Sequence, residues 1–408
     1  MGLKHKDNPP RDFHEDLTSV KATFTRPTGD DPEVVSLKDH RAVSSYNLID
    51  DTTPSILVPG SAPVWKATEF PVTPPKAEKG AVSKPNYSDP NAHHNPSAPL
   101  AALVQAVKVQ EPNFEFNKLN LVADRVNLRR LLAWASSAPD AKDFRIDVEL
   151  FGKNTVALTR WEAVAEASKA AIEKGFKEEA LGDATAFDAV EDGEVGAHFR
   201  IVSFDFLGTK ALVRFPVDCC TSDSRSRSLS TSTAGTLSPQ ADNQPLPAMQ
   251  DLSSGLTVHT AGNLVPQSAI VELSLISKTA KFDRIAAYDQ MLFSQTPSMY
   301  LARHSKGSFG SYEDIKLKEM RVSRSFARYF GSRRRTLTLL SPSPIQVEEK
   351  KAQPALHKLS LVLKEIEEKM KAMGPGSKAS LVSKEGKLEL YERTGGVGLP
   401  QGLADYFV

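Results

Sequence analysis

The sequence predicts an α+β fold, with a mixed sheet of about five strands flanked by helices over about residues 98–305. Alternating apolar and polar residues occur in paired segments joined by short turns, which is typical of half-buried hairpin strands. Between and after these segments, apolar residues recur every three or four positions, which indicates amphipathic helices. The 408 residues are enough for one to three domains.

Residues 1–97 predict a mostly disordered, proline-rich arm. Residues 1–99 hold 14 of the 27 prolines and few apolar residues, so the arm offers little surface to bury. One apolar patch at 44–65 is the exception. We expect this patch to be a strap that docks on the folded core.

The core strands follow from hairpin patterns and one isolated apolar segment. Helices are predicted at 100–107, 121–132, about 163–181, 285–293 and 297–303, and strands at 144–150, 156–161, 198–206, 210–218 and 269–276. Leu207-Gly208-Thr209 predicts the turn of the second hairpin. The internal segment 221–257 is expected to be a disordered Ser-rich loop, since residues 221–240 alone contain 11 Ser or Thr. It is either a phosphorylation segment or a tolerated insertion.

The C-terminal part has a pattern of its own. Residues 306–345 are expected to be a basic linker, and 346–408 a helix followed by a hairpin around Lys384-Glu385-Gly386. An apolar stripe along this helix indicates either packing on its own domain or a helix that binds a protein partner. The stripe consists of Leu356, Leu359, Leu363, Ile366 and Met370.

Composition excludes several classes of protein. With 51 Lys+Arg and 50 Asp+Glu the net charge is +1, so the chain is not a globally basic nucleic-acid binder. Adjacent Cys219 and Cys220 give no disulfide framework, and we expect them to fill a strand end. No run approaches 18 apolar residues, and the first residues lack an apolar signal core. We therefore expect an intracellular protein, in the nucleus or cytoplasm, with no membrane partner.

Common catalytic motifs are missing from the sequence. It contains no phosphate-cradling G-x-x-x-x-G-K-[ST], no G-x-G-x-x-G, no H-E-x-x-H, no G-x-S-x-G and no cysteine-pair zinc spacing. Prenyl-diphosphate chemistry needs clustered aspartates for magnesium, whereas Asp30-Asp31 and Asp50-Asp51 are isolated pairs. The motif pattern argues against that enzyme class.

The order of the predicted elements around Asp218 and Glu272 suggests a mechanism. A helix, a hairpin whose second strand ends at Asp218, a long loop, a strand with Glu272 and a helix follow one another. This order resembles the core of the PD-(D/E)XK nuclease fold, and its motifs resemble those of the decapping exoribonuclease (DXO-like) branch. The matching stretches are Gly175-Phe176-Lys177-Glu178-Glu179, Arg214-Phe215-Pro216-Val217-Asp218-Cys219 and Val271-Glu272-Leu273-Ser274.

The resemblance implies a metal site, although this sequence departs from the family pattern at two positions. In the family, such carboxylates hold one or two divalent ions and a lysine polarises water or phosphate. The metal-ligand candidates are Glu178, Glu179, Asp218 and Glu272, and the catalytic candidates are Asp218 and Glu272. However, Pro216 and Ser274 stand where that family has a carboxylate and the lysine. Lys278 has the right parity to replace the lysine but lies about 13 Å farther along the strand. We expect no cofactor, or weakly bound Mg²⁺ or Mn²⁺.

Most of residues 44–304 also resembles an uncharacterised fungal protein family. The shared motifs are Ser44-Ser45-Tyr46-Asn47-Leu48-Ile49-Asp50, the strand from His198 to Phe206, and Ser294-Gln295-Thr296-Pro297. Members often carry the label geranylgeranyl pyrophosphate synthetase. The missing aspartate clusters contradict that label.

A basic run is the candidate nucleic-acid contact. Six arginines and no acid lie between 321 and 335, interleaved with aromatic residues: Arg321, Arg324, Arg328, Arg333, Arg334 and Arg335. Such a run neutralises phosphates, and its aromatic residues stack on unpaired bases. A solvated face beside a linker and a nuclear-import signal are the alternatives.

Three functions follow. The preferred hypothesis is a non-catalytic binding or scaffold protein on a degenerate nuclease-like fold that contacts RNA. The second is a metal-dependent nuclease or decapping-type phosphodiesterase. The third is a protein-interaction module that acts through the C-terminal helix.

Overall fold

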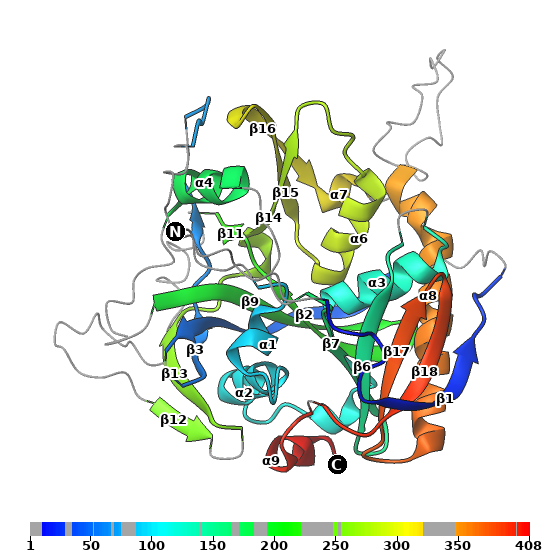
Figure 1. Cartoon of the computed structure of the whole chain (residues 1–408). Helices are drawn as coiled ribbons and strands as arrows, with labels where there is room; N and C mark the ends of the chain where they lie inside the picture. Colours follow the sequence, from blue (N-terminus) through cyan, green and yellow to red (C-terminus); the bar gives the residue numbers. More distant parts are fainter. Residues whose placement is uncertain are drawn as a thin grey trace, which may run out of the picture.

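The computed structural model describes most of the chain. The described residues are 10–28, 35–51, 53–66, 69–74, 87–138, 141–164, 171–182, 194–221, 248–251, 254–320, 347–396 and 398–408. They form two β-sheets with helices packed between and around them (Figure 1). The predicted α+β class with a mixed sheet flanked by helices is confirmed, although the sheets are larger than the five strands expected.

The larger sheet has twelve strands in the described part of the chain, in the order β1-β18-β17-β6-β7-β5-β10-β9-β2-β3-β13-β12. It is mixed, because β5 runs parallel to both β7 and β10 while β9 and β10 are antiparallel. Its strands are β1 (Leu17–Phe24), β2 (Leu37–Asp50), β3 (Ser55–Gly60), β5 (Leu121–Asp124), β6 (Phe144–Phe151), β7 (Thr155–Arg160), β9 (Glu194–Phe206), β10 (Thr209–Pro216), β12 (Ala248–Asp251), β13 (Leu256–Gly262), β17 (Lys378–Lys384) and β18 (Lys387–Arg393).

The smaller sheet has the strand order β16-β15-β14-β11-β4-β8 in the described residues. Its strands are β4 (Val64–Trp65), β8 (Leu181–Gly182), β11 (Cys219–Cys220), β14 (Ile270–Ser277), β15 (Ser298–Ser305) and β16 (Ser308–Lys316). The chain passes from the larger to the smaller sheet directly between β10 and β11, so Asp218 lies at the junction of the two sheets.

Helices cover both faces of the larger sheet. The α-helices are α1 (Pro90–His94), α2 (Ala101–Gln110), α3 (Arg125–Ala135), α4 (Ala171–Ala180), α6 (Arg284–Ser294), α7 (Leu317–Met320), α8 (Val347–Met373) and α9 (Gln401–Ala404), with short 3₁₀ turns at Phe116–Lys118, Gln267–Ala269 and Asp405–Phe407. In the described residues, no helix has both the length and the apolar character that a membrane span requires.

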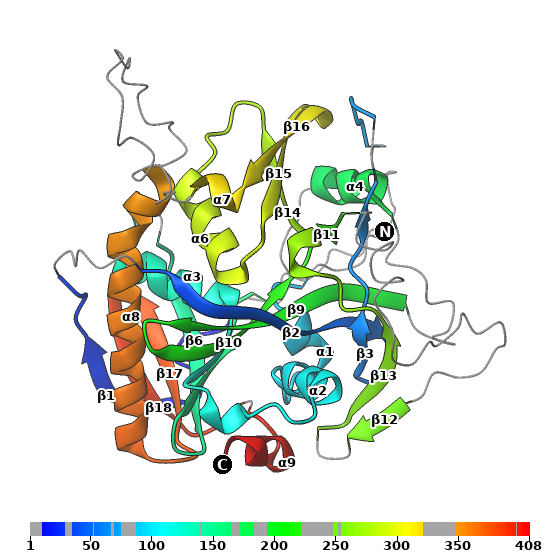
Figure 2. The same cartoon turned by 180° about the vertical axis from the view of Figure 1, so that it is seen from behind.

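The core consists of two main layers. Helices α3, α6 and α8 pack on one face of the larger sheet, where they share a buried cluster with the smaller sheet. Helix α2 and the C-terminal residues pack on the other face, as Figures 1 and 2 show from opposite sides. A third, smaller cluster lies between α4 and the smaller sheet.

Local turn chemistry explains the confirmed hairpins. Strands β9 and β10 are joined by Leu207 (φ 50°) and Gly208 (φ 87°), and β17 and β18 by Glu385 (φ 51°) and Gly386 (φ 81°). Positive φ at both turn residues matches the twist of two antiparallel strands, and glycine adopts it without steric cost.

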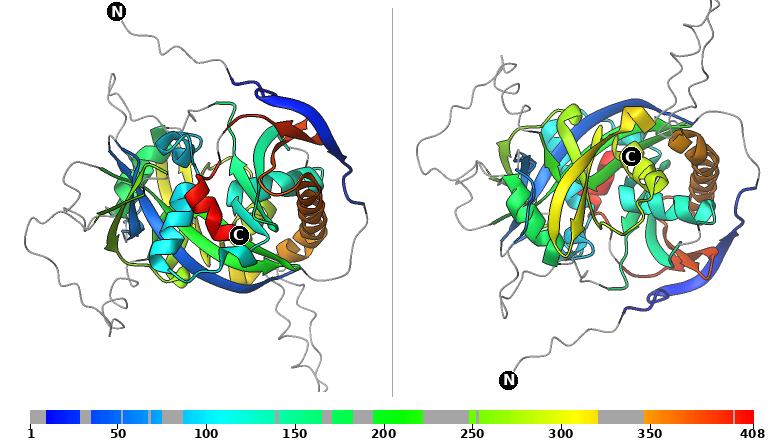
Figure 3. Two further views of the ribbon diagram at one scale, coloured as in Figure 1. Left: turned by 90° about the horizontal axis from the view of Figure 1, so that it is seen from below. Right: turned by 90° about the horizontal axis from the view of Figure 1, so that it is seen from above.

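The N-terminal segment corrects the prediction of a mostly disordered arm. Three strands of the larger sheet, β1, β2 and β3, come from it, and the expected strap at 44–65 is part of the sheets rather than an addition to them. Strand β2 runs as a long arc across the molecule between β9 and β3 (Figure 3). Strand β2 pairs on one side with β3 of the same segment and on the other with the distant β9, so the low apolar content of the segment does not prevent it from folding.

Tyr46 shows how firmly this strand is held. Its ring is fully buried and stacks on Phe199 with 5.3 Å between ring centroids. Its hydroxyl donates to Asn91 Oδ1 (2.6 Å) and accepts from Arg214 Nη1 (3.1 Å). Burial in this apolar setting raises the pKa of the Tyr46 phenol far above its usual value.

Of the predicted helices, 121–132 is wrong in part and 297–303 is wrong throughout. Residues 121–124 form strand β5 before α3 begins, and 298–305 form strand β15. Both segments are short apolar runs that periodicity alone does not distinguish from helix. The predicted Ser-rich loop, 221–257, contains β12 (248–251) and the start of its partner β13 (256–262), whereas 222–247 and 252–253 lie outside the described residues. The predicted basic linker, 306–345, is wrong at 308–320, which form β16 and α7, and its residues 321–345 lie outside the described residues.

Helix α8 buries the stripe that was considered for a protein partner. All five stripe residues are at most 4% exposed and lie in the core shared with α3 and α6. Arg284 of α6 also pairs with Glu348 in the first turn of α8 (3.2 Å). The apolar face is therefore already covered by this chain, and the interaction hypothesis loses its binding surface.

Leu363 and Leu361 give a matched test of this packing. Leu363 is 4% exposed and Leu361 is 40% exposed on the same helix. We expect Leu363→Lys to lower the free energy of unfolding by at least about 3 kcal/mol, because it places a charged ammonium group in an apolar core without a partner. Leu361→Lys should change it by about 0.5 kcal/mol or less. Urea denaturation measures both; a stable Leu363→Lys protein that only changes its size in light scattering would contradict this arrangement.

Candidate functional site

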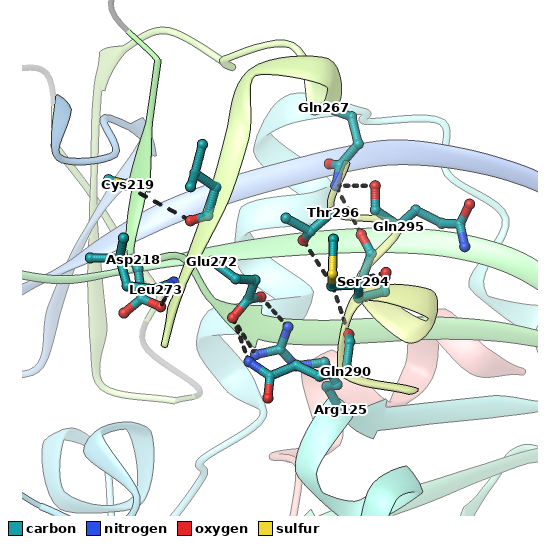
Figure 4. A network of polar contacts seen from close by, with 12 residues as sticks. Arg125, Asp218, Cys219, Gln267, Glu272, Leu273, Gln290, Ser294, Gln295 and Thr296 are labelled. Carbon is teal, nitrogen blue, oxygen red and sulfur yellow. Dashed lines mark hydrogen bonds and ion pairs between the residues drawn. The ribbon is translucent and has the colours of Figure 1, made fainter. Parts of the chain in front are cut away.

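The predicted carboxylates Asp218 and Glu272 lie at the junction of the two sheets. Asp218 precedes β11, and Cys219 is paired with Val271 of β14. Asp218 Oδ2 accepts a hydrogen bond from the backbone N–H of Leu273 (2.9 Å), next to Glu272. The structure therefore brings the two residues together in the backbone, but Figure 4 shows Glu272 pointing toward Arg125 and Gln290.

Asp218 is paired with a lysine from α4. Lys177 Nζ lies 2.5 Å from Asp218 Oδ1, and the side chains are 34% and 23% exposed. Burial alone would raise the Asp218 pKa, but the Lys177 ammonium and the Leu273 N–H outweigh it and hold the pKa below its usual value. For Lys177, burial acts to lower the pKa, but the charge and hydrogen bond of Asp218 outweigh it. The pKa of Lys177 is therefore raised above its usual value. Both groups are therefore charged near neutral pH.

Glu272 is buried and held by two side chains. It is 2% exposed and forms a two-pronged ion pair with Arg125 in the first turn of α3, in which Nη1 donates to Oε1 and Nη2 to Oε2. Gln290 of α6 also donates to Glu272 Oε2 (2.6 Å). Both carboxylate oxygens thus have donors from the chain itself, which is what a buried carboxylate requires.

The arrangement does not fit a divalent ion. Such an ion takes several oxygen ligands, and here each nearby carboxylate is already neutralised by a cationic side chain. Pro216, the last residue of β10, offers no side-chain oxygen, and Ser274 offers only a neutral hydroxyl. Among the residues that the structure describes, no three His, Cys, Asp or Glu side chains come together as a metal-binding group.

The helix glutamates do not complete the site. Glu178 and Glu179 are exposed on α4, whereas Lys177 of the same helix reaches Asp218. Successive helical positions point about 100° apart, so the lysine and the glutamates cannot all face the junction. Of the four predicted metal ligands, Asp218 and Glu272 lie close together in the backbone, whereas Glu178 and Glu179 are exposed on α4; their role as metal ligands stays a prediction.

A second acidic group lies beside this site on α6. Asp289 Oδ1 is buried without a hydrogen-bond partner among the described residues. Burial raises the Asp289 pKa to about 7; Arg129 of α3 opposes this rise and Asp283 adds to it. The contact between α3 and α6 therefore contains a carboxyl group that titrates near neutral pH.

A buried ion pair holds β5, the strand that directly precedes α3, against β10. Arg214 of β10 is fully buried and donates from Nε and Nη2 to both oxygens of Asp124, at 2.6 and 2.9 Å. Arg214 also donates to the Pro99 carbonyl (2.8 Å). Asp124 is the last residue of β5 and Arg125 the first of α3, so consecutive residues carry the two buried ion pairs.

The cysteines fill the strand end as expected. Cys219 and Cys220 form β11, are buried and make no disulfide. Burial, Asp218 and Cys220 raise the pKa of the Cys219 thiol above its usual value. A high thiol pKa means little thiolate at neutral pH, which does not favour a redox role.

The partners of the two carboxylates were not predicted from the sequence. Lys177 lay inside the quoted helix motif but was not assigned a role. Arg125 and Gln290 carried no local signal, since they are 147 and 18 residues from Glu272 in the chain. The six arginines of the basic run, Arg321, Arg324, Arg328, Arg333, Arg334 and Arg335, lie outside the described residues.

Comparison with family models gives one match. Residues 17–392 match the family described as a domain of unknown function (DUF8563). The chain belongs to this family. No curated protein matches it.

Solved structures give the fold. S. pombe Rai1 has a TM-score of 0.53 and 13% identity, over 91% of this chain and 99% of that one. Scheffersomyces stipitis Rai1, crystallised with (3′-NADP)⁺ and calcium, has a TM-score of 0.57 and 9% identity, over 95% and 99% of the two chains. Candida albicans Rai1, crystallised with pU5-Mn²⁺, has a TM-score of 0.54 and 11% identity, over 95% and 99%. These DUF8563 residues therefore adopt the Rai1 fold, which confirms the resemblance to the decapping exoribonuclease branch at the level of fold.

The Arg125–Glu272 pair is tested by removing first one charge and then both. Arg125→Met should lower the free energy of unfolding by about 3–5 kcal/mol, because Glu272 is left buried without a cation. The double variant Arg125→Met/Glu272→Leu should recover much of that loss, since no charge remains buried.

Lys118→Met serves as the control, because its exposed pair with Glu115 should contribute less than about 1 kcal/mol. Urea denaturation measures all four proteins. Equal costs for the single and double variants would show that the pair is not what stabilises this region.

Asp289 predicts a pH-dependent stability. Its folded pKa of about 7 lies above its ordinary value of 3.8, so the folded state binds the proton more tightly. This contribution is complete at low pH and is lost as the pH rises through 7. Asp289→Asn should therefore raise Tm more at pH 8 than at pH 5. The exposed Glu319→Gln should show no such difference; an equal gain for Asp289→Asn at both pH values would refute the shift.

Proposed function

We propose that this DUF8563 protein binds RNA on a Rai1-like fold without metal-dependent hydrolysis. The observation that carries the proposal is the pairing of both candidate catalytic carboxylates with cations of the chain, Lys177–Asp218 and Arg125–Glu272. In this reading, side chains supply the positive charge that a metal ion would supply in a nuclease.

The pairing opposes metal chemistry for a physical reason. Arg125 uses both oxygens of Glu272, and a metal would have to displace a buried guanidinium that then has no partner. Ser274 stands where the nuclease pattern has a lysine, and its neutral hydroxyl cannot polarise water or phosphate as a cation does. The residues present therefore bind and neutralise each other, and we assign no reaction step to them.

RNA as the ligand rests on two lines of support. Candida albicans Rai1, which shares the fold, was crystallised with pU5. In this chain, six arginines without an acid lie between 321 and 335, and each phosphate that such a run neutralises releases counterions. We place the RNA backbone contact on this run, with affinity that falls as salt rises.

A second candidate, a metal-dependent nuclease, has one observation in its favour. Asp218 is 23% exposed and its lowered pKa keeps it ionised, so a metal ion could reach it if Lys177 moved. Two proteins of the same fold were crystallised with calcium or manganese, which is a reason to test this chain for metal-dependent cleavage. Any ion bound in this way would be weakly held.

One experiment separates the two candidates. The purified full chain is incubated with end-labelled single-stranded RNA, with and without Mn²⁺, beside Asp218→Ala and Glu179→Gln. We expect no Mn²⁺-dependent cleavage and filter retention of the RNA that needs no metal. Arg333→Ala/Arg334→Ala/Arg335→Ala should weaken retention and reduce the slope of log affinity against log salt by about 2.

Cleavage that requires both Mn²⁺ and Asp218 would overturn the proposal in favour of the nuclease. If Glu179→Gln also lost that cleavage, Glu179 would belong to the metal site. Absence of both cleavage and retention would exclude RNA as the ligand.

A further inference from the structure

A pocket of about 530 Å³ lies far from the candidate site. It opens where the end of α8 meets β1 and the start and end of the β17–β18 hairpin. The polar lining comes from Lys21, Ser377, Lys378, Glu392 and Arg393, and Met373 closes one side. Its volume falls in the range of small-molecule sites, roughly 300–1,000 Å³.

The pocket lies at the opposite end of α8 from the contact with α6. Arg284 of α6 meets Glu348 in the first turn of α8, whereas Met373 is its last residue. A helix of 27 residues is about 40 Å long. Figure 2 shows α8 along its full length, with α6 and α7 beside its upper part. The pocket is thus independent of the carboxylate site.

The lining carries three cations and one carboxylate. Lys21 Nζ is 2.8 Å from Glu392 Oε2, so these two charges balance. Arg393 is buried; its Nη1 donates to the Gly395 carbonyl (2.7 Å) and lies 3.7 Å from Asp147 Oδ2. Arg393 is therefore balanced by Asp147, an acid outside the lining, whereas Lys21 is balanced by Glu392 within it.

Lys378 is the cation best placed to accept a ligand. It is 39% exposed, and its ion pair with Glu149 is long, 3.9 Å from Nζ to Oε1. Burial raises the Glu149 pKa, although Lys378 and Arg393 oppose this rise. A lysine with a distant partner keeps donors available for a phosphate.

Ser377 supplies a second, independent observation. Its Oγ is buried and has no hydrogen-bond partner among the described residues. A buried hydroxyl left unpaired costs about 1–3 kcal/mol, so such an atom beside a polar pocket points to a ligand or water that completes it. Neighbouring Gly376 has φ +74° and open space where a Cβ would lie, so the backbone leaves the entrance clear.

We propose that this pocket binds a small phosphorylated molecule, with its phosphate held by Lys378 and the Ser377 hydroxyl and attracted by Arg393. A phosphate is a dianion with several acceptor oxygens, and it matches the exposed Lys378 ammonium, the unpaired Ser377 hydroxyl and the positive charge of the nearby Arg393. The remaining volume accommodates the organic part, with Met373 as its apolar wall. This inference does not rest on RNA binding.

The test is isothermal titration calorimetry of the full chain with adenosine 5′-monophosphate, inorganic phosphate and adenosine. We expect the two phosphates to bind and adenosine not to bind. Tighter binding of the monophosphate identifies an organic phosphate as the ligand class, and equal affinities identify phosphate itself. Lys378→Met should weaken binding about 10- to 100-fold, and Ser377→Ala about 5-fold.

Lys387→Met is the matched control, because Lys387 lies at the other end of the same hairpin and is 63% exposed. It should bind like the natural chain. Ser377→Ala keeps the Lys378–Glu149 pair, so it tests the pocket even if Lys378→Met fails to fold. No binding of either phosphate, or binding that neither pocket variant changes, would overturn the proposal.

Discussion

The structure depends on a constraint set by two consecutive residues, Asp124 and Arg125. Each carries a charge into the interior, and each must therefore find a buried partner. Asp124 takes Arg214 of the neighbouring strand, and Arg125 takes Glu272 of the other sheet. Because strand β5 ends and α3 begins between them, these two ion pairs fix the helix against both sheets at once.

The same constraint explains the character of the candidate site. Buried carboxylates are stable only when paired, and a metal ion or a cationic side chain can serve as the partner. Pro216 and Ser274 stand where the nuclease pattern has a carboxylate and a lysine. With these groups replaced, the remaining carboxylates are satisfied by Arg125 and Lys177. The two departures in sequence thus occur in the same place as the two ion pairs that satisfy Asp218 and Glu272 within this chain.

The N-terminal segment shows a different effect of tertiary structure. Its prolines and sparse apolar residues predicted disorder, yet β2 lies between β9 and β3 with Tyr46 bonded to Asn91 and Arg214. The Ser-Ser-Tyr-Asn motif is therefore a structural motif: Ser44 donates to the Ala106 carbonyl and Ser45 to the Pro59 carbonyl. Neighbouring strands, and not the segment's own composition, stabilise it.

The sequence by itself determined the features that depend on nearby residues. The turns at Leu207-Gly208 and Glu385-Gly386, the alternation of β14 and the stripe of α8 are set by local backbone preference and periodicity. Only the tertiary structure decided which charges meet, since Lys177 and Asp218 are 41 residues apart and Arg125 and Glu272 are 147 apart. The tertiary structure also decided that α3 and α6 of the same chain cover the apolar face of α8. A stripe of apolar residues shows that a helix face is buried but does not show which surface buries it. Local energies act within a few residues, whereas the pairing of buried charges is fixed only when distant strands and helices come together.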